Sequence, residues 1–394
     1  MGATNSQSLR GAKASRFAPD DSWYEDVTYT EEPADIKQNR PYSGGVLLRD
    51  GRVVFVPHNA TTIGIFNPAT NAYSTIANQV GESFAQTGLP DTYPGALYYG
   101  GVLLRDGRVV FVPFCAKTIG IFDPTTNTYS TVPGAPGGAA YHDGVLLADG
   151  RVLFVPFCAT TFGIFDPKTN EYSTIAGVRA PGKAAYNGGV LLQDGRVMLL
   201  PWYSKRIGIF DPKTNKYSLG AKSALDKYAY RGSVLLADGR VLFVPHSTTG
   251  IGMFDPKTNT HSVVAEIPSK EFMYFGGVLL PDGRVLFVPY CAATIGIFDP
   301  ATNKYSAVAN TLGDATYQGG VLLADGRVLF VPWTWTVSHI GILTLPDVKA
   351  RARAHLRTEA VKQELIAAAW HPKRMTDWCL DTGERRELAE MGVD

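Results

Sequence analysis

The segment at residues 44–57, GGVLLRDGRVVFVP, occurs seven times in this chain with small changes. Each copy holds two apolar runs joined by an Asp-Gly pair. Such a corner is a strong signal for a β-hairpin, because glycine adopts a positive φ at no steric cost. The seven copies are located by their Asp-Gly-Arg triplets, which begin at Asp50, Asp106, Asp149, Asp194, Asp238, Asp282 and Asp325.

Each copy continues into a second hairpin. A third run of the TIGIFDP type leads into a D-P-x-T-N turn, as at residues 166–170, and then into an alternating, more polar segment, as at residues 172–175. Proline presets φ at the second position of such a turn, and aspartate can cap it. The first two runs are apolar throughout and therefore need cover on both faces. Each unit thus predicts four strands whose polarity rises from first to last.

Four strands of rising polarity are typical of a β-propeller blade, whose first strand lines the central axis. The triplets are spaced by 56, 43, 45, 44, 44 and 43 residues, so seven units predict an all-β, seven-bladed propeller over residues 22–346. The seventh unit lacks both the turn and the fourth strand. Tyr29 precedes Tyr42 at the spacing seen between other units, and we therefore expect residues 26–31 to close the ring as the outer strand of the last blade.

The units resemble the repeats of kelch and galactose-oxidase-type propellers, as in GVLLADGRVLFVP followed by GIFDPKTNEYS. The resemblance covers residues 42–346 and implies kelch-like, four-stranded blades. The chain departs from the family pattern in two places. The second strand ends in Val-Pro or Leu-Pro instead of Gly-Gly, and the final Trp is replaced by Tyr or by His261. Kelch-like folds host unrelated functions, so the resemblance implies no particular activity.

Composition excludes several classes of protein. Of 394 residues, 45% are hydrophobic and 19% are charged, which excludes wholesale disorder. With 37 basic and 36 acidic residues, no global field attracts nucleic acid. No apolar run is long enough to span a bilayer, and the N-terminus lacks the apolar core of a secretory signal. Four cysteines without a CxxC pair predict neither a disulfide framework nor a zinc site. We expect a cytoplasmic protein that is not secreted.

The residue after the tyrosine of each Tyr-x-Gly-Gly motif differs in all seven units. These positions begin the innermost strands and should surround the mouth of the axial channel. A ring of seven different side chains suits an asymmetric ligand or peptide, although unconstrained rim positions would also vary. This first ring consists of Ser43, Tyr99, His142, Asn187, Arg231, Phe275 and Gln318.

A second ring follows the proline of each second strand. Its members are all aromatic or histidine, which suits a protein hot spot or a sugar platform. Packing between blades is the alternative, mainly for Phe114 and Phe157. Tyr203 and Trp335 extend the ring, whose members are His58, Phe114, Phe157, Trp202, His246, Tyr290 and Trp333.

No phosphate-binding glycine loop, HExxH or GxSxG motif occurs. The histidines His58, His246 and His339 come from separate units without an obvious carboxylate partner. The sequence therefore predicts no enzyme, no cofactor and no metal. It favours a monomeric binding or scaffold propeller whose aromatic, variable face binds a protein or peptide. A carbohydrate-binding, lectin-like propeller is the alternative, and no nucleic acid is expected.

Both ends of the chain suggest attachments. Residues 1–6 fit the N-myristoylation pattern, with Gly2 as the acceptor, and residues 1–19 carry three basic and no acidic side chains. These features predict reversible membrane contact, and a plain flexible leader at residues 1–21 is the alternative. Residues 347–394 form a predicted helical tail, because 347–370 is Ala-rich and free of Gly and Pro. Its AAAWHPKRMTDWCLD segment is similar to tails of proteins from large DNA viruses of algae and protists, which leaves a place in a viral assembly open.

Overall fold

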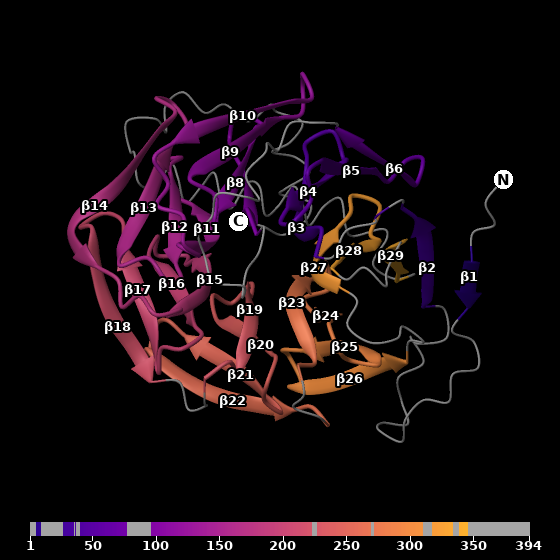
Figure 1. Cartoon of the computed structure of the whole chain (residues 1–394). Helices are drawn as coiled ribbons and strands as arrows, with labels where there is room; N and C mark the ends of the chain where they lie inside the picture. The colour runs from indigo at the N-terminus through magenta and orange to yellow at the C-terminus, as the bar shows by residue number, and fades with distance from the viewer. Residues whose placement is uncertain are drawn as a thin grey trace, which may run out of the picture.

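Seven four-stranded antiparallel blades surround a central axis in the computed structural model (Figure 1). The structure describes residues 5–8, 27–34, 36, 40–76, 96–222, 227–268, 272–309, 317–333 and 339–345. The predicted all-β, seven-bladed propeller is confirmed. Gly2, Trp335 and the predicted helical tail at 347–394 lie outside the described residues. Within the described part of the chain, no helix is long and apolar enough to cross a membrane.

The four strand positions recur from blade 1 to blade 7. The first strands line the axis and are β3 (Tyr42–Leu47), β7 (Tyr98–Leu103), β11 (Tyr141–Leu146), β15 (Tyr186–Leu191), β19 (Tyr230–Leu235), β23 (Tyr274–Leu279) and β27 (Tyr317–Leu322). The second strands are β4 (Val53–Pro57), β8 (Val109–Pro113), β12 (Val152–Pro156), β16 (Val197–Pro201), β20 (Val241–Pro245), β24 (Val285–Pro289) and β28 (Val328–Pro332).

The third strands are β5 (Ile63–Asn67), β9 (Thr118–Asp123), β13 (Thr161–Asp166), β17 (Arg206–Asp211), β21 (Gly250–Asp255), β25 (Thr294–Asp299) and β29 (His339–Thr344). The outer strands are β6 (Ala72–Ile76), β10 (Thr128–Pro133), β14 (Glu171–Arg179), β18 (Lys216–Lys222), β22 (Thr260–Glu266), β26 (Lys304–Ala309) and β2 (Thr28–Pro33). A further strand, β1 (Asn5–Ser8), pairs with β2.

Burial follows the predicted polarity. Every residue of a second strand such as β12 is buried, whereas an outer strand such as β10 is mostly exposed. The first strands are buried at their tyrosines and partly exposed further along, as in β3. The axial channel is therefore accessible along the first strands, and the core consists of the layers between neighbouring blades.

The repeated tyrosines bridge six of the seven blades from inside to outside. The Tyr98 hydroxyl lies 2.7 Å from that of Tyr129, so a first strand is tied to the outer strand of its own blade. The aromatic ring of Tyr98 lies over Gly120, where an added Cβ would be only 3.1 Å from it. This close approach explains the glycine in every third strand. The hydroxyl pairs are Tyr42–Tyr73, Tyr98–Tyr129, Tyr141–Tyr172, Tyr186–Tyr217, Tyr274–Tyr305 and Tyr317–Tyr29.

The ring closes as the sequence predicts. β2 pairs antiparallel with β29, from Thr28 opposite Thr344 to Pro33 opposite His339. The Tyr29 and Tyr317 hydroxyls lie 2.5 Å apart, which repeats the tyrosine bridge across segments from opposite ends of the chain. The closing strand from residues 26–31 is thus confirmed with shifted bounds. The sequence did not lead us to expect β1 within the flexible leader.

Arginines of the Asp-Gly-Arg triplets connect neighbouring blades. Arg327 forms an ion pair with Asp325 at 2.6 Å and also donates to Asn71 Oδ1 at 2.7 Å and to the Pro68 carbonyl at 2.6 Å. These acceptors belong to the D-P-x-T-N-type turn of blade 1. Arg52 and Arg108 reach the turns of blades 2 and 3 in the same way. At this end of the propeller, called here the turn end, these contacts join neighbouring blades.

Candidate functional site

The two predicted rings meet at the opposite end of the propeller, called here the variable end, where the first strands begin. Their aromatic side chains pack into one cluster that includes Tyr99, Phe114, Phe157, Phe275 and Trp333. We expected a face that presents these side chains to a partner, and most are instead buried because neighbouring first strands converge there. The buried members of the predicted site are Tyr99, His142, Asn187, His246, Phe275, Gln318 and Trp333.

Four predicted residues, Arg231 and three aromatic ones, keep surface at the variable end. Tyr203 is 39% exposed, and Trp202 and Tyr290 are half-buried. Phe272, which the sequence analysis did not single out, is 55% exposed and lies 5.3 Å from the His246 ring. Trp335 lies outside the described residues. The exposed aromatic surface is therefore smaller than predicted and belongs to blades 4, 5 and 6.

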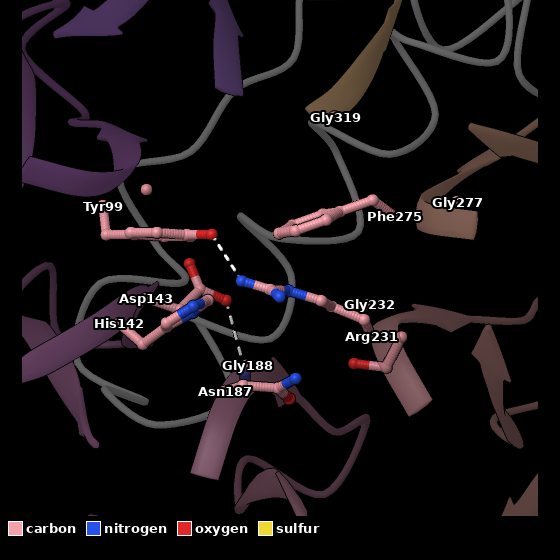
Figure 2. Close-up of a pocket in the computed structure, with 14 residues that line it drawn as sticks. Tyr99, His142, Asp143, Asn187, Gly188, Arg231, Gly232, Phe275, Gly277 and Gly319 are labelled. Carbon is pink, nitrogen blue, oxygen red and sulfur yellow. Dashed lines mark hydrogen bonds between the residues drawn. The ribbon is translucent and has the colours of Figure 1, made fainter. Parts of the chain in front are cut away.

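Arg231 occupies the centre of the aromatic cluster. Its guanidinium carbon lies 3.7 Å from the Phe275 ring centroid and 4.9 Å from that of Trp202. Its Nη2 donates a 2.6 Å hydrogen bond to the Tyr99 hydroxyl (Figure 2). Aromatic faces stabilise a cation removed from water. Because Arg231 belongs to blade 5 and Tyr99 to blade 2, this bond crosses the channel mouth.

The histidines and the tyrosine around Arg231 are neutral near pH 7. Burial lowers the pKa of His58 to about 4 and that of His246 to about 3, and the charge of Arg231 acts in the same direction. The pKa of His142 is also lowered, chiefly by burial and then by Arg231. Burial raises the pKa of the Tyr99 hydroxyl to about 12. Arg231 therefore supplies the positive charge of this cluster.

An axial cavity of about 200 Å³ adjoins Arg231, Tyr99, His142, Asn187 and Phe275. Much of its remaining wall is the backbone of glycines at the motif's first Gly position. There the strands crowd the axis: a Cβ on Gly232 would lie 2.6 Å from the Gly276 Cα. Six units have glycine at this position, namely Gly44, Gly100, Gly188, Gly232, Gly276 and Gly319.

Asp143 is the exception in blade 3, and its carboxylate faces the cavity (Figure 2). It accepts backbone hydrogen bonds from Gly144 at 2.8 Å and Gly189 at 3.2 Å. Among the described residues, no ion pair joins it to Arg231. Burial raises its pKa to about 6, and the two backbone bonds oppose this shift. Asp143 was not among the predicted site residues, and its one signal in the sequence is the single break in a column of glycines.

Two buried polar atoms in this wall have no hydrogen-bond partner within the described structure. They are Asn187 Oδ1 and Arg231 Nε. Buried polar atoms are satisfied in the great majority of native proteins, by protein, water or a ligand. Both side chains line the cavity, which therefore combines a cation and an amide that still have hydrogen-bonding capacity with a titratable carboxyl group.

The solved structures that are similar to this chain include two lyases and an oxidase. A streptogramin B lyase has a TM-score of 0.68 at 19% identity, covering 82% of this chain and 99% of that one. A catalytically inactive virginiamycin B lyase from Staphylococcus aureus with quinupristin has a TM-score of 0.66 at 16% identity, covering 81% and 100%. A fungal alcohol oxidase of the AA5 family in complex with copper has a TM-score of 0.60 at 14% identity, covering 81% and 76%. No protein-family model and no curated protein matches the sequence.

At these identities the likeness establishes the fold alone, a β-propeller. The kelch type of the repeats and the viral character of the tail stay predictions. The prediction that the protein is not an enzyme is contradicted, because the similar propellers include two lyases and an oxidase. Side chains that meet at a propeller axis come from separate blades, so the lack of a short catalytic motif excluded nothing.

The copper of the alcohol oxidase is not carried over to this chain. Within the described ranges, no group of three or more His, Cys, Asp or Glu side chains could hold a metal ion. The site that the structure brings together is an axial cavity lined by an arginine among aromatic rings and by a half-buried aspartate.

Proposed function

We propose that the protein is a ligand-binding propeller whose axial cavity takes a small molecule. One observation carries this proposal: five of the seven side chains that differ among the near-identical units, Arg231 among them, line one cavity together with Asp143. Blade packing explains the residues that repeat, and it does not require an arginine or an aspartate at the axis. The cavity of about 200 Å³ is at the small end for ligand sites, which favours a compact ligand.

A thermal-shift screen of small polar metabolites tests this proposal. A true ligand should raise the melting temperature of the wild type, and the shift should be lost in Arg231→Gln and Asp143→Asn. Arg240→Gln and Asp238→Asn at the turn end are matched controls and should respond as the wild type does. A shift that persists in both cavity variants would place the ligand elsewhere.

A catalytic role is the second candidate. A carboxyl group with a pKa of about 6 inside a cavity can take up or release a proton near neutral pH, which is what a general base or acid requires. The lyases and the oxidase among the similar propellers support this candidate at the level of fold. Incubating a bound compound with wild type and Asp143→Asn, followed by mass spectrometry, tests it. Turnover by the wild type alone supports it, and equal turnover by both contradicts it.

A protein or peptide partner at the variable end is favoured by a separate observation. Tyr203 and Phe272 are exposed, and Phe272 has a φ of 46°, a backbone conformation that is strained for a bulky residue. Lys227 lies 5.0 Å over the Tyr203 ring. A purified partner should bind the wild type and lose affinity for Tyr203→Ser with Phe272→Ser. Binding on a glycan array that is lost in Trp202→Ala would support the carbohydrate alternative.

The cytoplasmic location and the reversible membrane contact through Gly2 are further proposals, supported by the sequence alone. Intact-mass measurement of the protein purified from its own cells tests whether Gly2 carries a myristoyl group. A mass without the myristoyl group would contradict the membrane contact.

A further inference from the structure

The axial cavity keeps one positive and one negative group apart. Arg231 in blade 5 donates to the Tyr99 hydroxyl, and its Nε has no partner within the described structure. Asp143 in blade 3 accepts two backbone N–H groups, from Gly144 and Gly189. A carboxylate has about four acceptor sites, so roughly half of its capacity is unused. Each charge can therefore still bind a complementary group.

The rest of the described wall carries no further charge. His142 is neutral because burial and Arg231 lower its pKa, and the Tyr99 hydroxyl keeps its proton. Asn187 is an uncharged amide with a free acceptor. The rings of Phe275 and Tyr99 add flat apolar surface. A complementary ligand thus has one anionic end, one cationic or donor end and a small apolar part.

We propose that the cavity binds a small zwitterion of the α-amino-acid type, with its carboxylate at Arg231 and its ammonium at Asp143. This inference rests on the proposed function, since it requires the cavity to be the ligand site. A simple anion would leave the Asp143 charge unpaired beside it, and a simple cation would face Arg231 unpaired. Unpaired buried charges are strongly unfavourable. Arginine also pairs well with carboxylates through its fork of N–H donors.

Isothermal titration calorimetry with three probes tests the proposal at pH 7.5, where Asp143 is ionised. The probes are L-valine, 3-methylbutanoate, which lacks the ammonium group, and isobutylamine, which lacks the carboxylate. We expect L-valine to bind at least tenfold more tightly than either analogue. Arg231→Gln and Asp143→Asn should each weaken L-valine binding at least tenfold, and Arg240→Gln and Asp238→Asn should leave it unchanged.

Equal binding of the three probes, or no binding of L-valine at millimolar concentration, would overturn the proposal that the ligand is a zwitterion. So would unchanged affinity in both cavity variants. The comparison of probes uses only wild-type protein, so it decides the question even if a variant does not fold. In one such outcome, L-valine shows no binding while a screened compound raises the melting temperature of the wild type and not of the cavity variants. In that case the proposed function stands and only the ligand class is wrong.

Discussion

In this repeat, a single position shows which residue serves the fold and which is a candidate for function: six units have glycine there and one has Asp143. At one of these glycines, Gly232, the strands come so close that an added Cβ would lie 2.6 Å from the Gly276 Cα. An aspartate at this position introduces a side chain where the other units have none, and it places a carboxylate where burial disfavours its charge. A residue that is costly to the fold and unnecessary for it is a candidate for function.

Asp143→Asn should change the pH dependence of stability. The folded pKa of about 6 lies above the ordinary value of 3.8, so the folded state holds this proton to higher pH than the unfolded chain. The contribution to stability is full below about pH 4 and is lost as the pH rises to 6, by at most about 3 kcal/mol. We expect the variant to gain about 1–2 kcal/mol over the wild type at pH 7.5 and nothing at pH 4. Urea unfolding at both values measures this; equal differences would contradict the assigned pKa.

Gly163→Ala should destabilise blade 3. The new Cβ would lie 2.9 Å from the Tyr141 ring and 2.9 Å from that of Tyr172, which the tyrosine bridge holds in place. Overpacking of this kind costs about 1–3 kcal/mol. Gly188→Ala is the matched control, since its nearest neighbours lie at 3.7 and 3.8 Å. Similar melting temperatures for the two variants would show that the bridge tolerates a methyl group.

At the level of elements, stability depends on how blade 7 closes. β2 supplies its outer strand, and Val27 and Tyr29 join the core cluster between blades 6 and 7. Removing residues 1–33 should lower the melting temperature sharply or prevent folding. Removing residues 1–26 keeps β2 and should cost far less. Equal effects of the two deletions, measured by thermal unfolding, would show that closure does not depend on β2.

The link between the Asp-Gly-Arg corner and the next blade gives another prediction. Arg327→Gln removes two hydrogen bonds to the blade 1 turn and should cost about 1–3 kcal/mol. Arg151 pairs with Asp149, and the described structure gives it no bond to the next blade's turn, so Arg151→Gln should cost less than about 1 kcal/mol. Chemical denaturation compares them, and equal losses would contradict a role in joining blades.

For the whole molecule, the repeat made the fold predictable. The hairpin corners, the all-apolar second strands and the missing strand of unit seven led to seven blades and their closure. The site was less predictable, because its residues meet only after the blades form a ring. The first ring includes Arg231 and Tyr99, yet their bond across the channel and the packing of both rings into one cluster depend on distances that no local pattern encodes. Asp143 was missed because one carboxylate among glycines resembles a tolerated substitution.

The central claim is that a small molecule occupies the axial cavity between Arg231 and Asp143. A crystal structure grown with the compound that gives the largest thermal shift tests it most directly. We predict density for that compound in the cavity, with one of its acceptor atoms at the Arg231 guanidinium and one of its donor atoms at the Asp143 carboxylate. Density for the compound elsewhere, with only ordered water in the cavity, would contradict the account.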